Sequence, residues 1–386
     1  MMKKIGNLLL ALILSIALFL GVLYYKENKS YTGYIKNNNI VINNSNEKYD
    51  ENYRINKLRR NNNSIYYQSL NEDEKKMYVK LANTIKNLDN SFVVSKEEFK
   101  GDFSTSLGKV VNYFLNDHPE VFYLNSEYKY NEYDSVFKHE YIVTISYLSD
   151  DKNKINEQIE MLDNKINSIV SNVNSTDEYE IELQLHDYIA KNIVYDYDKK
   201  NENIHNVYGG LISKKAVCDG ISKSLSLLLE RKNIDSYIVV GKIENQPHAW
   251  TMVKLNNNYY HTDLTADISV NKSDNIIVHT YLNRVVEDIK KTHHIEDEEV
   301  LPKTSKDDLN YYVKNDFIIQ KNDNFENKLS NIIYKNRNNH VIEFKVNNMA
   351  EAKNMLVNVL SKRPEFRGKN RITYYEIFDT IIIKNT

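Results

Sequence analysis

The first strong pattern along the chain is an apolar run without charges at residues 5–25. Lys3 and Lys4 precede this run, and charged residues follow it from Lys26 onward. A helix of this length is sufficient to cross a hydrocarbon core of about 30 Å. The run lacks the small-residue cleavage site of a secretory signal peptide, so we expect an uncleaved signal anchor at residues 1–25, with a cleaved signal peptide as the alternative. Under both interpretations the rest of the chain is exported, and the basic pair favours a cytoplasmic amino end.

Residues 26–63 have the opposite pattern: they are polar, rich in Asn, Lys and Ser, and weakly periodic in apolar residues. We therefore predict a flexible spacer next to the membrane. An α+β module is expected at residues 64–175. Its first helix is predicted to begin after Asn71, which caps the helix while Glu74 completes a capping box. Further helices are expected at residues 106–116 and 154–173, and strands at residues 121–124, 128–130 and 141–147.

Helical and strand periodicities alternate more closely in the rest of the chain. Residues 176–305 are predicted to form one domain, with a helix at 176–195, a helix from Cys218, strands at 236–241, 248–255 and 259–264, and an edge segment at 278–282. Residues 306–386 are predicted to form a small α/β module, with a strand at 316–320, a helix at 324–335, a strand at 341–346, a helix at 350–361 and a strand at 372–383.

Composition and charge exclude one class of partner and draw attention to one residue. The 386 residues include 51 basic and 53 acidic side chains, for a formal net charge of -2. This balance leaves no excess of positive charge that would attract nucleic acid, so no nucleic-acid partner is expected. The chain has one cysteine, Cys218, which cannot form an intramolecular disulfide. An exported protein with one cysteine does not use disulfides for stability, and its thiol is a candidate nucleophile.

Cys218 opens a predicted helix in which Ile221, Leu225 and Leu228 form a buried stripe. The amino end of a helix carries partial positive charge and unpaired N–H groups, which favour thiolate over thiol and can stabilise an oxyanion. Position alone leaves open a buried structural cysteine, because free cysteine is among the most buried residue types. A nucleophilic thiol needs a base, and the base needs an acid that holds its tautomer.

A predicted β-hairpin supplies both partners. His248 begins one strand and Asp263 lies in the next, and the Asn-Asn turn at residues 256–257 suits positive φ. A two-residue loop makes Leu255 face Asn258, and alternation then places His248 and Asp263 on one face as diagonal neighbours, roughly 7–8 Å apart between backbones. A loop of odd length would turn Asp263 to the opposite face. The hypothesis therefore predicts an even-numbered hairpin loop.

Other histidines compete for the role of base. His261 shares the predicted face of Asp263 and is the alternative base. His293 and His294 lie in an acidic stretch, where we expect them to be solvated. A metal site built from the thiol and the hairpin residues is disfavoured, because they contain no close ligand pair such as C-x-x-C or H-x-x-x-H. No metal ion and no cofactor are therefore expected.

Three motifs in order resemble the bacterial transglutaminase-like superfamily: KAVCDGISK at residues 215–223, HAW at 248–250 and YHTDLT at 260–265. The resemblance covers about residues 180–305. It implies an α+β fold with a papain-like transglutaminase core, in which a helix carrying Cys218 packs on an antiparallel sheet carrying His248 and Asp263. The flanking α/β modules and the N-terminal membrane helix complete the expected fold. The resemblance also implies a nucleophilic Cys218, His248 as base and Asp263 as orienting acid.

The chain departs from the family's pattern beside these motifs. Ile221 and Ala266 stand where family members often have aromatic residues, and the second change removes an aromatic side chain of the cleft and leaves acceptor recognition open. Trp250 is a candidate substrate-binding residue that walls the cleft, with core packing as the alternative. Tyr208 is a second candidate for substrate contact and for the second oxyanion donor.

The leading functional hypothesis is an extracytoplasmic, membrane-anchored thiol enzyme that acts on amide bonds of cell-surface protein or peptide. The acyl-enzyme is then resolved by water, as in a protease or amidase, or by an amine, as in a transglutaminase. The alternative is a non-catalytic surface adhesion or wall-organising module that retains the fold. The expected partners are a protein or peptide substrate and the membrane, and the oligomeric state is left open.

Overall fold

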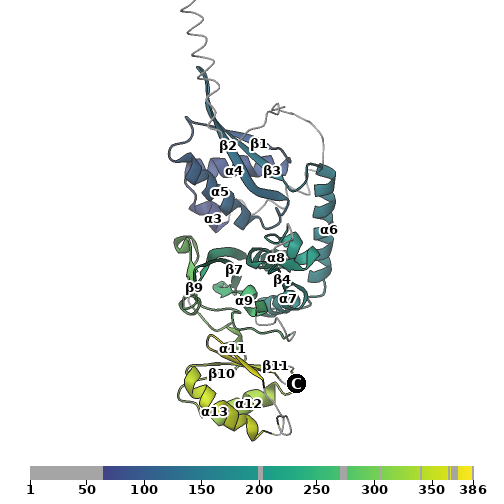
Figure 1. Ribbon diagram of the computed structural model, residues 1–386, viewed down its shortest axis with the longest axis vertical. Coiled ribbons are helices and arrows are strands. Elements are labelled where there is room, and N and C mark those ends of the chain that lie inside the picture. The colour runs from purple at the N-terminus through teal and green to yellow at the C-terminus, as the bar shows by residue number, and fades with distance from the viewer. Residues whose placement is uncertain are drawn as a thin grey trace, which may run out of the picture. The chain divides into compact units, whose positions relative to one another are not determined.

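We describe the protein from a computed structural model (Figure 1). The structure describes residues 64–198, 203–269, 276–304, 306–339, 341–363, 366 and 373–384. The chain divides into two compact units, Met1–Asn156 and Glu157–Thr386, which we call the N-terminal unit and the C-terminal unit. The expected membrane helix and spacer lie outside the described residues. Among the described helices, none is long and apolar enough to cross a bilayer.

The N-terminal unit combines helices with a three-stranded antiparallel sheet of order β1-β3-β2. Its elements are α3 (Ile65–Ser69), α4 (Glu72–Lys86), β1 (Ser91–Ser95), α5 (Phe103–Asp117), β2 (Leu124–Asp134) and β3 (His139–Tyr147). The predicted capping box is confirmed, because Asn71 accepts from the Glu74 N–H and the Glu74 carboxylate accepts from the Asn71 N–H. The two short strands predicted at residues 121–130 are instead one strand, β2, with a register shift between Leu124 and Tyr128.

The first part of the C-terminal unit contains a four-stranded antiparallel sheet of order β8-β7-β6-β9, with helix α8 packed against β6 and β7 (Figure 1). Helix α6 (Lys152–Val170) begins in the last residues of the N-terminal unit and continues into the C-terminal unit. The elements that follow it are α7 (Glu178–Asn192), β4 (Val194–Tyr195), the π-helix η2 (Gly209–Ser213), β5 (Lys215–Ala216), α8 (Cys218–Arg231), β6 (Ser236–Ile243), β7 (Gln246–Leu255), β8 (Asn258–Thr262), α9 (Leu264–Ser269), α10 (Val286–Ile289), β9 (His293–Ile295), the 3₁₀ helix η3 (Glu298–Val300) and α11 (Tyr311–Lys314). A helix on an antiparallel sheet is the predicted arrangement.

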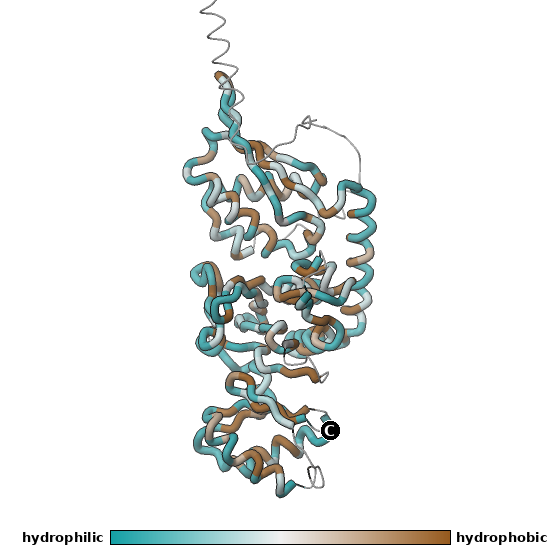
Figure 2. Tube along the Cα trace, in the orientation of Figure 1, coloured by the Kyte–Doolittle hydropathy of each residue, from teal (hydrophilic) through white to brown (hydrophobic). Residues whose placement is uncertain are grey.

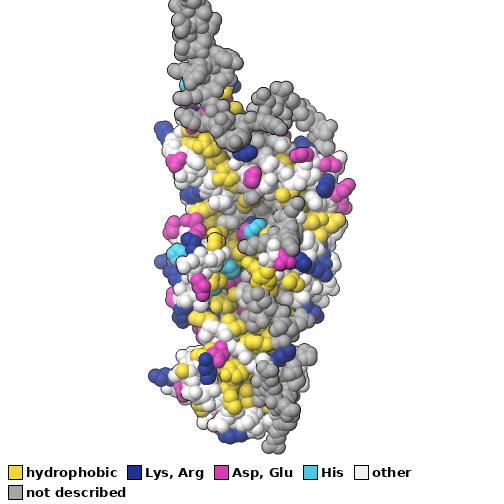
Figure 3. Space-filling model, viewed as in Figure 1, with side chains coloured by type: hydrophobic (Ala, Val, Ile, Leu, Met, Phe, Trp, Pro, Cys, Tyr) yellow, Lys and Arg dark blue, Asp and Glu magenta, His cyan; other side chains and the backbone are white. Residues whose placement is uncertain are grey.

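Hydrophobic burial explains why α8 lies against this sheet. The side chains of Ile221, Leu225 and Leu228 are fully buried, as their helical spacing predicts. Figure 2 shows hydrophobic positions alternating with hydrophilic ones along the helices. On the outer surface, basic and acidic side chains are interspersed over the face shown in Figure 3, in keeping with the small net charge. The apolar stripe therefore fixes which side of α8 faces β6 and β7.

The hairpin of β7 and β8 has the register that the sequence predicts. Leu255 pairs with Asn258 across a two-residue loop, and Asn256 and Asn257 have φ values of 48° and 63°. Positive φ at both central positions is typical of the tight turns that match the twist of a hairpin. Strand β8 ends at Thr262, one residue earlier than required to include the predicted acid, which instead precedes α9.

Strand β9 completes the sheet and depends on a glycine. Gly241 of β6 pairs with His248 on one side and with Ile295 on the other. A Cβ at Gly241 would collide with the His294 carbonyl oxygen and press on the Trp250 ring. The absence of a side chain therefore lets β9 approach β6, which brings the segment 293–295 into the sheet.

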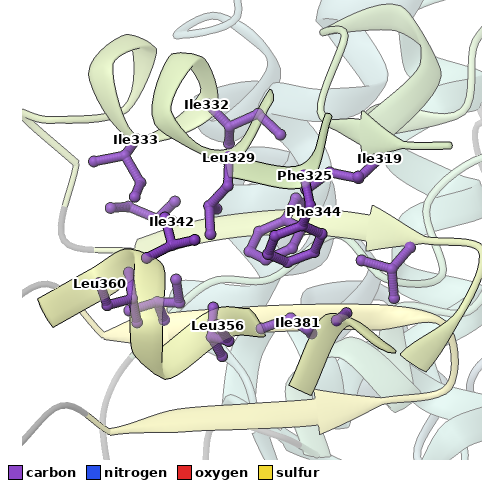
Figure 4. Packing of buried hydrophobic residues seen from close by; sticks show 14 of the residues in the cluster. Ile319, Phe325, Leu329, Ile332, Ile333, Ile342, Phe344, Leu356, Leu360 and Ile381 are labelled. Carbon is purple, nitrogen blue, oxygen red and sulfur yellow. The ribbon is translucent and has the colours of Figure 1, made fainter. Parts of the chain in front are cut away.

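The second part of the C-terminal unit is the predicted α/β module. It consists of β10 (Ile318–Ile319), α12 (Phe325–Lys335), β11 (Val341–Val346), α13 (Met349–Ser361), β12 (Tyr374–Ile377) and β13 (Thr380–Lys384), with sheet order β10-β11-β13-β12. Figure 4 shows Leu329 and Ile332 of α12 directed toward Ile342 and Phe344 of β11. The single strand predicted at residues 372–383 is wrong, because the chain turns between β12 and β13.

The segment at residues 278–282 also differs from its prediction. It was expected at a sheet edge, but it forms no strand and runs through turns. Its backbone is held by other means: the Asp263 N–H donates to the Tyr281 carbonyl at 3.1 Å, and His261 and Arg284 form an isolated bridge. The segment is nevertheless buried, since Val278 and Leu282 are both in the core.

Candidate active site

Cys218 is the first residue of α8, as the sequence predicts. Val217 precedes the helix and makes no side-chain capping bond. The first-turn N–H groups of a helix lack intrahelical acceptors, and the helix dipole favours negative charge at this end. Cys218 is partly exposed and lies in an environment that suits an anion.

A pair of hydroxyl groups joins the start of α8 to β7. Ser222 Oγ lies 2.8 Å from the Cys218 carbonyl oxygen and 3.0 Å from the Ala249 carbonyl oxygen, so it can donate to either one. Thr251 Oγ1 donates to the Ser222 carbonyl oxygen at 3.3 Å. Because Ala249 follows His248 directly, these bonds hold the thiol beside the imidazole.

His248 contacts both of its predicted partners. Its Nε2 lies 2.7 Å from Asp263 Oδ2, and the Cys218 side chain lies close enough to raise the pKa of the imidazole. Because Nε2 is engaged by Asp263, Nδ1 is the ring nitrogen that is left for the thiol. Burial lowers the pKa of His248, but the charge and hydrogen bond of Asp263 and the contact with Cys218 outweigh burial and raise the pKa to about 10. A protonated imidazole at this position favours a thiolate beside it.

Asp263 is fully buried between α9 and two imidazoles. Its Oδ1 accepts from the Ala266 N–H at 3.1 Å, while Oδ2 lies 2.7 Å from His248 Nε2 and 2.9 Å from His293 Nε2. Burial raises the pKa of Asp263, yet the charge and hydrogen bond of His248, together with His293, hold the pKa well below its usual range. The carboxylate is therefore ionised and fixed at both oxygens.

His293 corrects the prediction that the His-His pair is solvated. Its side chain is buried on β9 and bonds to Asp263, with its Nδ1 2.7 Å from the Thr292 hydroxyl. Only His294 is exposed, since neighbours on a strand point to opposite faces. The available signal was this alternation, in which His293 and Ile295 share one face.

His261, the alternative base, is placed elsewhere. It pairs with Met252 across the hairpin, and Trp250 Nε1 donates to its Nδ1 at 3.0 Å. Burial, with a smaller effect from the charge of His293, lowers the pKa of His261 to about 3. The structure therefore favours His248 over His261 as the base, because Asp263 bonds to His248 and His293 and not to His261.

The candidate substrate-binding residues lie in different surroundings. Trp250 is fully buried, stacked 6.0 Å from the His248 ring and packed edge-on at 4.8 Å from the His293 ring. Such a side chain supports the two imidazoles from within the core, so burial favours the packing alternative over a cleft wall. Tyr208 is half-buried at the start of η2, and its hydroxyl donates to Met161 Sδ at 3.3 Å. Its role toward a substrate stays a prediction.

Tyr195 is a neighbour of the thiol that the sequence pattern does not predict. It lies on β4 and pairs with Ala216 of β5, just before Cys218. Burial, and then the negative charge of Cys218, raise the pKa of Tyr195. Only the parallel pairing of β4 with β5 brings this side chain to the thiol, and a pair of two-residue strands leaves almost no periodic signal in the sequence.

Comparison with known proteins finds a family that is similar to this region of the chain. Residues 167–264 match the family model of the transglutaminase-like superfamily, and this match contains Cys218, His248 and Asp263. No curated protein matches the chain.

Several solved structures are also similar to parts of it. A transglutaminase (TGase) crystal structure has 15% identity and a TM-score of 0.28, with 58% of each chain covered. A candidate cysteine protease from Cytophaga hutchinsonii has 12% identity and a TM-score of 0.24, with 36% of this chain and 61% of that one covered. A candidate protease from Parabacteroides distasonis has 10% identity and a TM-score of 0.22, with 37% and 40% covered. The chain thus spans less than two thirds of each of these proteins.

Proposed function

We propose that this chain, whose residues 167–264 belong to the transglutaminase-like superfamily, is a thiol enzyme that attacks amide bonds of protein or peptide. One observation carries the proposal: the Cys218 side chain lies beside the His248 imidazole and raises its pKa, and Nε2 of that imidazole lies 2.7 Å from Asp263 Oδ2. A nucleophile, a base and an orienting acid in contact are the parts that covalent acyl transfer needs.

In the first step, the Cys218 sulfur attacks the carbonyl carbon of the amide. The oxyanion that forms lies near the first-turn N–H groups of α8, which can donate to it. As the C–N bond breaks, the His248 imidazolium gives its proton to the leaving amine. The product of this step is a thioester between Cys218 and the acyl group.

In the second step, water or an amine attacks the thioester carbon, and His248 accepts the proton of the attacking group. The C–S bond breaks and the thiolate returns. Asp263 stays ionised throughout, because its role is to orient the imidazole and to stabilise the imidazolium. Hydrolysis and amine transfer share all of these steps except the identity of the second nucleophile.

The proposed location is the outer face of the cell membrane, with cell-surface protein or peptide as the accessible substrate. Support comes from the apolar run at residues 5–25 and from Lys3 and Lys4 before it. Protease added to intact cells that express the full chain should remove the body and leave a short anchored fragment. A body that is digested only after the cells are lysed would contradict this location.

The enzymatic proposal is tested by incubating the full-length chain with cell-surface proteins and a fluorescent primary amine. We expect either covalent incorporation of the amine or new peptide ends, and neither with Cys218→Ala. The ratio of the two products separates transfer from hydrolysis. Equal product with the wild type and with Cys218→Ala would favour the alternative, a non-catalytic surface module that retains the fold.

A further inference from the structure

A second cluster of ionisable side chains lies in the C-terminal unit, away from the thiol. Asp187 Oδ1 is 3.1 Å from His186 Nδ1 and 2.9 Å from His279 Nε2. These atoms all lie within 4.8 Å of one another. His186 and Asp187 belong to α7, while His279 lies in the irregular segment before Tyr281. Two imidazole nitrogens and a carboxylate oxygen thus converge on one point.

The outer nitrogens of both imidazoles are bonded to further carboxylates. His186 Nε2 is 3.2 Å from Asp267 Oδ2, and His279 Nδ1 is 2.6 Å from Glu343 Oε1. Glu343 is itself held by the Tyr312 hydroxyl at 2.7 Å. A histidine that binds a metal almost always donates its outer N–H to such a partner, which fixes the ring and frees the inner nitrogen. Both imidazoles are therefore already oriented with the inner nitrogens toward Asp187.

Charge and exposure at the cluster suit a cation. Three carboxylates surround two imidazoles, so the cluster is negative unless protons or a cation compensate it. The His186 side chain is fully buried, whereas 40% of the Asp187 side chain is exposed and leaves a route from solvent.

We propose that His186, Asp187 and His279 bind a divalent transition-metal ion, with Zn²⁺ as the preferred ion. The ligands are Nδ1 of His186, a carboxylate oxygen of Asp187 and Nε2 of His279, and a water molecule completes the four-coordinate set. Imidazole ligands select Zn²⁺ and related metals over Mg²⁺ or Ca²⁺, which prefer oxygen ligands. Binding releases the protons that the inner ring nitrogens carry, so charge balance is preserved.

The ion would act on structure, because its surroundings reach the acid of the candidate active site. The Tyr281 N–H donates to Asp267 Oδ1 at 3.0 Å, and the Tyr281 carbonyl accepts from the Asp263 N–H at 3.1 Å. Through Glu343 of β11, the same cluster reaches the C-terminal module. A bound ion therefore ties α7, α9 and β11 together around Asp263. The proposal does not depend on the proposed enzymatic function.

The test uses the full-length chain, stripped of metal with a chelator and titrated with Zn²⁺ by calorimetry, with bound metal counted by mass spectrometry. We expect about one Zn²⁺ per chain. Asp187→Asn should weaken binding by at least about 100-fold, and Glu343→Gln by about 10- to 100-fold. Two controls should bind as the wild type does: Cys218→Ala, and His139→Gln, which removes an exposed His–Asp pair of similar length.

Co²⁺ in place of Zn²⁺ gives a readout that does not depend on how well the variants fold. In the wild type we expect the visible bands of a four-coordinate site with nitrogen and oxygen ligands, without an absorption band from thiolate to Co²⁺. Three results would each overturn the proposal: no stoichiometric binding by the wild type, unchanged binding by folded Asp187→Asn, or a thiolate band that Cys218→Ala removes.

Discussion

Two carboxylates in the C-terminal unit are each held between two imidazoles, and the outer partners of those imidazoles differ. The imidazoles on Asp263 face the Cys218 thiol and a threonine hydroxyl, which are not carboxylates. The imidazoles on Asp187 face Asp267 and Glu343. The first arrangement leaves one ring nitrogen directed at a nucleophile, while the second surrounds both rings with negative charge. The same central unit thus suits proton transfer at one place and cation binding at the other.

The two clusters differ in which of their groups is accessible to solvent. The Asp263 side chain is fully buried and the imidazole of His248 is partly accessible, so a substrate can reach the base but not the acid. At the other cluster the imidazoles are buried or nearly so, and the carboxylate of Asp187 is the accessible group. An incoming amide therefore meets a thiol and an imidazole, whereas an incoming ion meets a carboxylate.

The largest expected difference between the clusters is in catalysis. Replacing His248 with Ala should lower the rate of acyl transfer by about 10⁴-fold or more, because the thiol loses its base and the leaving amine loses its proton donor. His279→Gln, the matched change in the other cluster, should cost less than about 100-fold. Rates of amine incorporation or peptide release by the two variants check this. Equal losses of rate in the two variants would contradict the assignment of catalysis to the cluster at Asp263.

The stability of the folded protein should depend on pH, and a histidine from each cluster should contribute to that dependence. Because the pKa values of His248 and His279 are about 10, above the ordinary value near 6.5, their contribution is complete below about pH 6.5 and is lost as pH rises through 10. With a chelator present, the free energy of unfolding should fall by several kcal/mol between pH 6.5 and 10.

Denaturant unfolding followed by circular dichroism measures this dependence. In His279→Gln the decline should be less steep, since the raised pKa of His279 no longer contributes while that of His248 still does. His139→Gln should follow the wild-type curve. A wild-type free energy of unfolding that is flat or rises over this range would show that the histidines do not hold their protons in the folded state.

His293 is expected to act through Asp263 as a positioning residue. Its replacement by Gln should lower the rate of acyl transfer by about 10- to 100-fold, by analogy with the loss of an orienting partner behind a ligand or base. The exposed neighbour His294→Gln is the matched control and should leave the rate unchanged. A shift in the pH profile of the rate for His293→Gln alone would distinguish positioning from a general loss of folded protein.

The smallest effect is expected at the surface pair of His139 and Asp134 in the N-terminal unit. Their 2.9 Å contact is as short as those in the two buried clusters, but both side chains are about half exposed. Solvent screening limits such pairs to about 0–1 kcal/mol. The free energy of unfolding of His139→Gln at pH 6 should thus differ from that of the wild type by less than about 1 kcal/mol. A larger loss of unfolding free energy would show that burial is not what distinguishes this pair from the pairs in the two clusters.

The sequence predicted what local patterns encode. The stripe beneath Cys218 predicted α8, and the Asn-Asn turn predicted the hairpin register that puts His248 and Asp263 in contact. These features depend on residues close together in the chain, or on a single loop whose length fixes the pairing.

Features that depend on distant segments leave no local pattern in the sequence. His186 bonds to a residue 81 positions away and His279 to one 92 positions away, so no spacing rule could join them. Burial of His293 requires β9 to pair with β6, which depends on the missing side chain at Gly241. An acidic sequence around the His-His pair suggested solvent, but the strand placed one of the two in the core.

The most direct test of the central claim is the rate at which iodoacetamide alkylates Cys218 between pH 5 and 9 in the full-length chain. The sole cysteine makes the signal unambiguous. We expect fast reaction of the wild type and of His279→Gln at pH 6–7, where an ordinary cysteine with a pKa of about 8.5 is slow. His248→Ala should react as an ordinary cysteine does. Identical profiles for the wild type and His248→Ala would contradict the account, because the thiol would then owe nothing to the imidazole beside it.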